Sequence, residues 1–179
     1  ILATNPDIKV KLKGDHSLNK RSMKKLIYLM NSFGANFLPK NKFTFPLKMV
    51  SSKFPIGIKY IAGVSAQLKS AVILAGLNSF GKTEIIENEK SRDHTENILI
   101  NNKQVIKIKE KKNKTIEIFG KEQLKPIFID VPGDPSSAAF FVSLTLLCKD
   151  SKIKIKNVGM NPTRMGFYKI LKSQNANIK

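Results

Sequence analysis

An internal repeat is the feature that most constrains the fold of this chain. Residues 65–99 align with residues 136–171. Each copy reads as an apolar helix, a polar turn, an alternating strand, a turn that carries an arginine, and a second amphipathic helix. Residues 14–36 match only the second helix and its exit. A fixed period indicates a repeated supersecondary unit, and the alternation of strands and helices predicts the α/β class.

The arginines follow the same period. Only three of the 32 basic residues are arginine, and they lie at nearly equal intervals along the chain, at Arg21, Arg92 and Arg164. A guanidinium group binds phosphate or carboxylate through two parallel hydrogen bonds, which lysine cannot do. The spacing therefore favours anion-binding or structural arginines at equivalent places in a repeated unit.

Length and composition limit the class of protein. A chain of 179 residues that is 41% hydrophobic can form one medium domain or parts of two. It has no apolar run of about 18 residues and no signal-peptide pattern at its start, so we expect no membrane partner. The net charge of +19 fits either a nucleic-acid footprint or a solvated lysine-rich surface. We favour the second, because aromatic residues do not interleave with the lysines.

Local signals predict the elements. We expect a helix over Leu26–Phe33, with Ser17 as its N-cap and Gly34 just past its end. We expect a second helix, buried, over Ser65–Leu77, and a third that opens at Asp134-Pro135. The expected strands are Val105–Ile108, Thr115–Phe119, Ile127–Val131 and Lys152–Val158, with weaker candidates at Phe43–Met49 and Ile56–Ile61, and a hairpin turn at 109–114. The single cysteine, Cys148, lies in an apolar run, so we expect a buried, inert thiol and a reducing compartment.

Three turn-to-helix junctions carry the polar residues suited to anions. Ser65 with the N–H group of Ala66 can cradle an anion at a helix start, and Gln67 can reach a hydroxyl or lie against a ring. Helix capping explains Ser65 equally well without any ligand. The two histidines, His16 and His94, do not have zinc spacing, and neither a Walker A nor a dinucleotide-binding glycine pattern occurs. We expect neither metal nor cofactor.

The motifs at these junctions resemble the 5-enolpyruvylshikimate-3-phosphate synthase family. GDHSLNKRSM (14–23), SAQLKSAVILAGLNSFGKT (65–83), SRDHTE (91–96), VPGDPSSAAFF (131–141) and NPTRMG (161–166) match family blocks in order. The resemblance implies a partial inside-out α/β barrel built from repeated βαβαββ units around buried helices. It also implies that residues 1–130 are the later part of the first domain and residues 131–179 the start of the second, with a hinge near Val131–Gly133.

The resemblance further implies an activity and its site residues. Family members join the 5-hydroxyl of shikimate 3-phosphate to C2 of phosphoenolpyruvate through a tetrahedral intermediate, and phosphate leaves. Arg21 would bind phosphoenolpyruvate, Ser65 and Ala66 the phosphate of shikimate 3-phosphate, Gln67 its ring, and Arg92 the same substrate. Arg164 would be structural. The catalytic acid and base are expected in family segments that have no match here. The complete enzyme is expected to be a cytoplasmic monomer that does not bind nucleic acid.

Three alternatives remain open at this point. UDP-N-acetylglucosamine enolpyruvyl transferase has the same fold and chemistry, but its usual loop cysteine has no counterpart here. A basic RNA-binding domain built of related units is a second alternative. The third is a folded segment that is inactive alone, since the family's opening Lys-Ser…Arg motif and its late acidic and basic positions are not matched.

Overall fold

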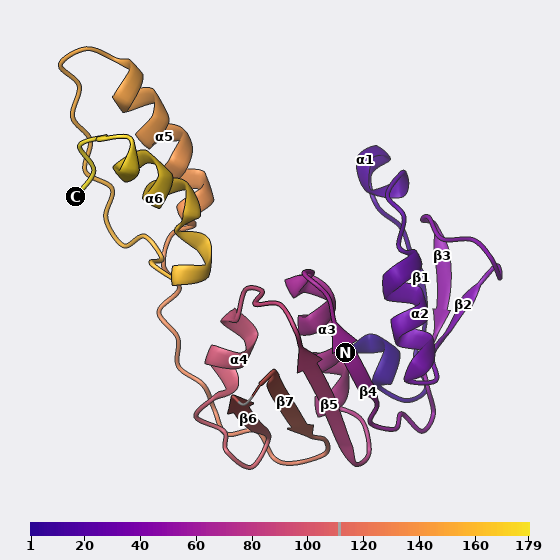
Figure 1. The fold of residues 1–179 in the computed structure, drawn as a ribbon. Coiled ribbons are helices and arrows are strands. Elements are labelled where there is room, and N and C mark those ends of the chain that lie inside the picture. The colour runs from indigo at the N-terminus through magenta and orange to yellow at the C-terminus, as the bar shows by residue number, and fades with distance from the viewer. Residues whose placement is uncertain (111) are drawn as a thin grey trace. The chain divides into compact units, whose positions relative to one another are not determined.

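The computed structural model describes residues 1–110 and 112–179, which form two compact units, Ile1–Pro126 and Ile127–Lys179 (Figure 1). The domain boundary expected between residues 130 and 131 stays a prediction. The elements of the first unit, in chain order, are η1 (Leu2–Thr4), β1 (Lys9–Leu12), α1 (His16–Asn19), α2 (Lys24–Ser32), β2 (Asn36–Leu38), β3 (Leu47–Val50), β4 (Lys59–Ala62), α3 (Ala66–Leu77), β5 (Lys82–Glu87), α4 (His94–Leu99), β6 (Ile106–Glu110) and β7 (Lys114–Phe119).

The strands of the first unit form two sheets that share one connectivity. The four-stranded sheet has the order β4-β5-β7-β6, with β4 and β5 parallel and the other neighbours antiparallel. Residues 59–119 are therefore one complete βαβαββ unit. The three-stranded sheet has the order β1-β3-β2, which reproduces β5-β7-β6, and α2 takes the place of α4. The fold class predicted from the sequence is confirmed, and the first unit contains a repeated arrangement of strands and helices.

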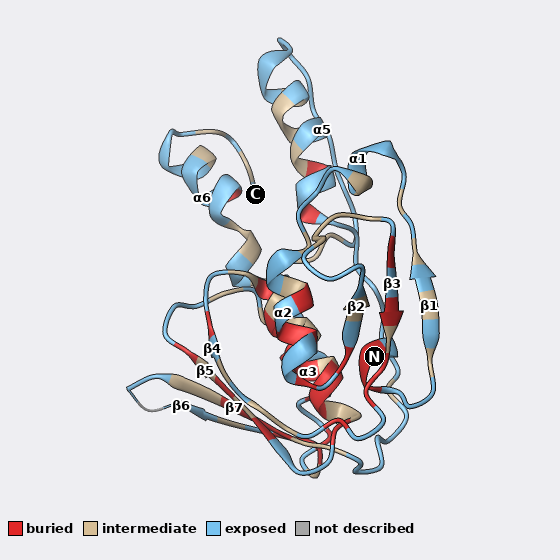
Figure 2. Cartoon of the chain, turned by 90° about the vertical axis from the view of Figure 1, so that its right-hand side faces the viewer, coloured by how far each residue is buried: buried red, intermediate tan, exposed pale blue. Residues whose placement is uncertain are grey.

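The helices α2 and α3 lie between the two sheets. α2 packs on β2, α3 packs on β4, β5 and β7, and the two helices pack on each other. Figure 2 shows buried residues concentrated on these helices and on the sheet beside α3. The side chains of Val72, Ile73, Ile85 and Ile116 have no exposed surface. The expectation of a buried helix over Ser65–Leu77 is confirmed.

The end of α2 follows the sequence signal, but its start does not. Gly34 has φ +92°, and the N–H groups of Gly34 and Ala35 donate to the carbonyls of Asn31 and Met30, as in a Schellman cap. The expected cap at Ser17 is wrong. Asp15 instead caps the separate short helix α1 by accepting from the Leu18 N–H at 2.7 Å. Between the two helices, the Met23 N–H donates to the Phe43 carbonyl at 2.7 Å instead of to a carbonyl of α1.

Most expected strands of the first unit form. β6 and β7 occupy the positions predicted at Val105–Ile108 and Thr115–Phe119 and pair antiparallel. The turn expected at 109–114 includes residue 111, which lies outside the described residues. The two weaker candidates form only at their ends, as β3 from Leu47 and β4 from Lys59. Ile56 makes no more than an isolated bridge to Phe80.

The second unit contains α5 (Pro135–Leu147), η2 (Pro162–Arg164) and α6 (Gly166–Ser173). Asp134 caps α5 and Pro135 occupies its first turn, as expected. The strands expected at Ile127–Val131 and Lys152–Val158 are wrong. A strand needs a hydrogen-bonding neighbour along its length, and here the only pairing among the described residues is one parallel bridge, Gly133 to Val158.

That bridge repeats a pair from the first unit. The step along the chain from Ala62 to Gly133 equals the step from Glu87 to Val158, and both equal the step from Arg21 to Arg92. Ala62 and Glu87 are themselves paired in the parallel β4–β5 ladder. The second unit therefore begins the same βαβ arrangement, and one rung of its ladder is formed.

The helix α5 presents a largely exposed apolar surface within its own unit. Phe140, Leu144 and Leu147 expose 78%, 60% and 86% of their surface. Cys148 follows directly and is exposed and free, so the expectation of a buried thiol is wrong. The residues of this unit do not cover that stretch of helix, so the apolar run is exposed within the unit.

Candidate functional site

The parallel pair β4–β5 brings two of the expected site segments to one edge of the sheet. Both strands run in the same direction, and their last residues, Ala62 and Glu87, are register partners. β4 continues through Gly63 and Val64 into Ser65 and α3, and β5 continues through residues 88–93 into α4. The carboxyl ends of parallel strands are where α/β sheets bind their ligands. The geometry thus places Ser65–Gln67 and Arg92 in loops that start side by side.

The start of α3 is arranged as the sequence predicts. Ser65 adopts an extended backbone, and its Oγ accepts from the Leu68 N–H at 3.4 Å. The Ser65 Oγ and the Gln67 Oε1 lie 3.5 Å apart. The N–H groups of Ala66 and Gln67 belong to the first turn, where no earlier helical carbonyl can accept them. A bound anion can therefore be held by these N–H groups, by the Ser65 hydroxyl, and by the positive end of the helix dipole.

A cluster of four charged residues, three buried and one partly exposed, joins the two segments. It consists of Lys69 on α3, Glu87 on β5, Glu96 on α4 and Lys114 on β7. The Lys69 Nζ lies 2.7 Å from Oε1 of Glu87 and 2.7 Å from Oε1 of Glu96. The Lys114 Nζ lies 3.5 Å from Glu87 and 3.4 Å from Glu96. With two ammonium and two carboxylate groups, the cluster is neutral overall.

Burial makes this charge cluster a strict geometric constraint. The side chain of Lys69 is fully buried, and those of Glu87 and Glu96 are 1% exposed. Oε2 of Glu96 has no hydrogen-bond partner in the described structure. A buried charge that loses its partner is costly, so small displacements of α3, β5 or α4 against one another are opposed.

Glu87 also fixes the loop in which Arg92 lies. Its Oε1 accepts from the Ser91 backbone N–H at 2.9 Å and from the Ser91 Oγ at 2.8 Å. Burial raises the pKa of Glu87, but the hydrogen bonds from Lys69 and Ser91 outweigh burial and hold the pKa below its ordinary value. Glu87 is therefore charged at neutral pH. The adjacent Arg92 side chain is exposed and makes no ion pair within the described part of the chain.

The three periodic arginines occupy equivalent places. Arg21 lies three residues before α2, while Arg92 and Arg164 lie two residues before α4 and α6. Arg21 is exposed in the segment between α1 and α2, and no contact among the described residues joins it to the other expected site residues. Arg164 donates to Asp134 Oδ1 at 2.6 Å and also to the Ser136 hydroxyl. This pairing with the α5 cap supports the structural role expected for Arg164.

The sequence reasoning missed the charge cluster. One signal was available, because Lys69 is the only charged residue of the largely apolar helix α3. Its partners Glu87 and Glu96 lie well beyond the end of that helix, on the next strand and the next helix, and no periodic pattern links them to it. The motif pair SAQLK and RDHTE thus includes both partners of a buried ion pair as well as the expected ligand contacts.

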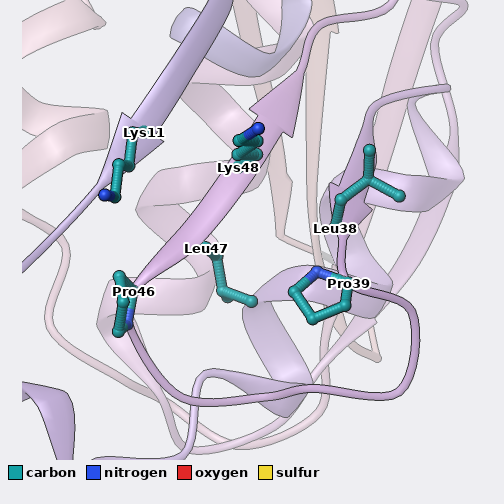
Figure 3. A pocket seen from close by; sticks show the side chains of 6 residues that line it. All are labelled: Lys11, Leu38, Pro39, Pro46, Leu47 and Lys48. Carbon is teal, nitrogen blue, oxygen red and sulfur yellow. The ribbon is translucent and has the colours of Figure 1, made fainter.

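A separate hollow lies on the three-stranded sheet and contains none of the expected site residues. Figure 3 shows Lys11 and Lys48 on neighbouring strands, where they are register partners. The lining residues are Lys11, Leu38, Pro39, Pro46, Leu47 and Lys48. Among the described residues, no group of three or more histidine, cysteine or acidic side chains is placed to bind a metal ion. None of the described helices is both long and apolar enough to span a bilayer.

Comparison with known proteins identifies close relatives over the whole chain. The family model of EPSP synthase (3-phosphoshikimate 1-carboxyvinyltransferase) matches residues 1–179. The 3-phosphoshikimate 1-carboxyvinyltransferase of a Ruegeria species is 40% identical over 179 residues, which is 99% of this chain and 40% of that protein. The enzyme of the same name from Caldicellulosiruptor bescii is 44% identical over 172 residues, which is 94% of this chain and 39% of that protein.

A solved structure agrees with these matches. The EPSP synthase of Acinetobacter baumannii superposes with a TM-score of 0.75 at 34% identity, over 97% of this chain and 39% of that one. The chain therefore spans about two fifths of the length of the relatives it matches. The matches favour this family over UDP-N-acetylglucosamine enolpyruvyl transferase and over an RNA-binding domain.

Proposed function

This chain belongs to the EPSP synthase family, and we propose that it supplies the shikimate 3-phosphate site of an enzyme that transfers an enolpyruvyl group. The substrates would be shikimate 3-phosphate and phosphoenolpyruvate, and the product would carry the enolpyruvyl group on the 5-hydroxyl. The observation that carries this proposal is that the segments leading to Ser65–Gln67 and to Arg92 start from the neighbouring carboxyl ends of β4 and β5.

The arrangement suits a phosphorylated, hydroxyl-bearing ring. The Ser65 hydroxyl and the N–H group of Ala66 would hold the phosphate at the start of α3, where the helix dipole favours a negative charge. The Arg92 guanidinium would bind the same substrate from the neighbouring loop, and the exposed Gln67 side chain would reach the ring. Two multiply charged anions must be held together in this reaction, so charge neutralisation and positioning would be the main work of the protein.

The assignment of Arg21 to phosphoenolpyruvate rests on the family motif alone. Arg21 is exposed and topologically equivalent to Arg92, which is consistent with binding a second anion from the neighbouring repeat. We further propose a cytoplasmic location and a monomeric complete enzyme. The catalytic acid and base are not among the residues matched here, so we expect no turnover from these 179 residues alone.

Titration calorimetry with the 179-residue chain tests the binding proposal. Shikimate 3-phosphate should bind, weakly, and phosphoenolpyruvate should produce little or no heat of binding. Replacement of Gln67 by alanine should weaken the binding of shikimate 3-phosphate. Replacement of the exposed Lys53 by methionine is the control: it removes a positive charge from the same unit and should leave that binding unchanged. Preferential binding of phosphoenolpyruvate would contradict the assignment of the site.

A phosphate-release assay with both substrates tests the expectation that these 179 residues alone do not catalyse the reaction. An ordinary enzymatic rate of about 1 to 1000 per second from this chain alone would show that the catalytic groups lie within it, contrary to our expectation.

A further inference from the structure

We propose that Lys69 is a positioning residue for shikimate 3-phosphate, which sets the separation between the Ser65–Gln67 turn and Arg92. This inference rests on the function proposed above and adds a residue to it. The Lys69 side chain has no exposed surface, so it cannot touch a substrate. Its effect must act through the backbone segments to which it is bonded.

The first connection runs from Lys69 to the phosphate cradle. Lys69 lies one helical turn after Ser65, and its N–H donates to the Ser65 carbonyl at 3.1 Å. The helix between them is regular, so the position of the ammonium group and the position of the cap are fixed relative to each other. A shift of Lys69 along or around the helix axis moves the Ser65 hydroxyl with it.

The second connection runs from Lys69 to both ends of the segment that carries Arg92. Glu87 lies at the end of β5, five residues before Arg92, and Glu96 lies in the first turn of α4, four residues after it. One ammonium group holds both carboxylates at 2.7 Å. Glu87 in turn holds Ser91, the residue next to Arg92, through two hydrogen bonds. The loop is therefore anchored on either side of Arg92 to a single atom of α3.

The use of charge at this buried place points to geometry rather than to stability. Buried ion pairs are often no more stabilising than well-packed apolar residues of similar size, and the rest of α3 is apolar except for short polar side chains and Gln67 in its first turn. Charge-assisted hydrogen bonds, unlike apolar contacts, have defined directions and lengths. The Ser70 and Thr95 hydroxyls, 2.7 Å apart, add a second connection between α3 and α4, but they do not reach β5 or Ser91.

Two variants of the 179-residue chain test the role, with one matched control. Lys69→Met removes the shared ammonium group. Ser91→Ala removes one of the two hydrogen bonds to Glu87 and creates no unpaired buried charge, so it should fold even if Lys69→Met does not. The control is Glu117→Gln, which alters a carboxylate held by Lys82 at 3.0 Å and Lys109 at 2.8 Å on the opposite face of the same sheet.

The measurements are the affinity for shikimate 3-phosphate by calorimetry and the hydrogen exchange of the Ser91 amide without ligand. At a temperature where each variant is folded, we expect Lys69→Met and Ser91→Ala to weaken binding about tenfold to a hundredfold, as expected for a misplaced binding group. The backbone amide of residue 91 should exchange faster in both variants, relative to the intrinsic rate for its sequence, while the Val72 amide in the interior of α3 is unchanged in Ser91→Ala. The control should bind within about twofold of the unsubstituted chain.

The outcomes separate the two proposals. If the unsubstituted chain binds shikimate 3-phosphate and the two variants bind it equally well, the positioning role is wrong and the proposed function stands. If all three variants weaken binding to the same extent, general loosening explains the result and the positioning role is again wrong. If the unsubstituted chain does not bind the substrate at all, the proposed function fails and the positioning role fails with it.

Discussion

Replacement of Lys69 by methionine should strongly destabilise the first unit, and the structure allows the size of the effect to be worked out. Methionine has a similar length and no charge, so packing is largely kept. The change leaves the carboxylates of Glu87 and Glu96, both nearly fully buried, with Lys114 as their only cation among the described residues. The cluster then holds one uncompensated negative charge.

The expected loss in the free energy of unfolding is about 3 kcal/mol at pH 7, because removal of one partner from a buried ion pair typically costs about 3–5 kcal/mol. The lower end applies here, because Lys114 remains 3.4 Å from Glu96 and 3.5 Å from Glu87 and is itself 17% exposed. Urea denaturation followed by circular dichroism measures the difference. Lys82→Met, which removes a half-exposed partner of Glu117, is the control and should cost much less.

The loss should shrink as the pH is lowered. In the unsubstituted chain the folded-state pKa of Glu87 lies below the ordinary value of 4.5, so its contribution is complete above pH 4.5 and is lost as the pH falls through the folded-state pKa. In the variant, Glu87 keeps the two hydrogen bonds from Ser91 but loses those causes of a lowered pKa that come from Lys69, while burial, which raises the pKa, remains. Its folded-state pKa should therefore be higher than in the unsubstituted chain, and the folded variant should lose less stability than the unsubstituted chain as the pH falls.

A difference in unfolding free energy that stays the same as the pH falls from 7 to below 4.5 would refute this reasoning. So would a Lys69→Met variant as stable as the unsubstituted chain at pH 7. Either result would mean that water or a shift of Lys114 compensates the two carboxylates.

Other predictions concern a turn and two arginines. Gly34→Ala should cost about 1–2 kcal/mol in a urea titration, because Gly34 has φ +92° and an added Cβ would lie 2.5 Å from the Ser52 Oγ; an unchanged midpoint would contradict it. Arg92→Lys should weaken shikimate 3-phosphate binding by about 1.5–3 kcal/mol in calorimetry, because lysine lacks the planar fork. In the complete enzyme, Arg21→Lys should instead raise the Michaelis constant for phosphoenolpyruvate or lower the turnover number. Steady-state kinetics with each substrate varied in turn measures this, and equal effects on the Michaelis constants of the two substrates would contradict the assignment.

Much of the fold could be predicted because it depends on residue patterns that are local in the sequence. The apolar run of α3, the glycine after α2 and the Asp134-Pro135 start of α5 each act over one or two helical turns, and all three appear in the structure. The repeat predicted that equivalent arginines would precede equivalent helices, which the element order confirms.

The failures share a physical cause, which is dependence on distant partners. Ser17 is a good capping residue, but α2 begins only after Met23, whose N–H donates to the distant Phe43 carbonyl. The alternating pattern of Lys152–Val158 is typical of a strand, but a strand forms only beside another, and one bridge to Gly133 is all that the described residues of this unit provide. The cluster around Lys69 was missed for the same reason, since opposite charges on separate elements of the chain have no periodic signature.

Each sheet of the first unit is built from one contiguous stretch of sequence, and this has a consequence for how the chain folds during its synthesis. Among the strand pairings described in the first unit, the pair farthest apart along the sequence is Lys9 and Val50. In the four-stranded sheet, the β4–β5 ladder pairs Lys59 with Glu84, and the β5–β7 ladder pairs Lys82 with Phe119. Each sheet is thus closed by a contiguous stretch of sequence, and pairings between nearby segments form fast. A growing polypeptide can complete the three-stranded sheet, then the βαβαββ unit with its buried charges, while the ribosome is still adding the residues of α5 and α6.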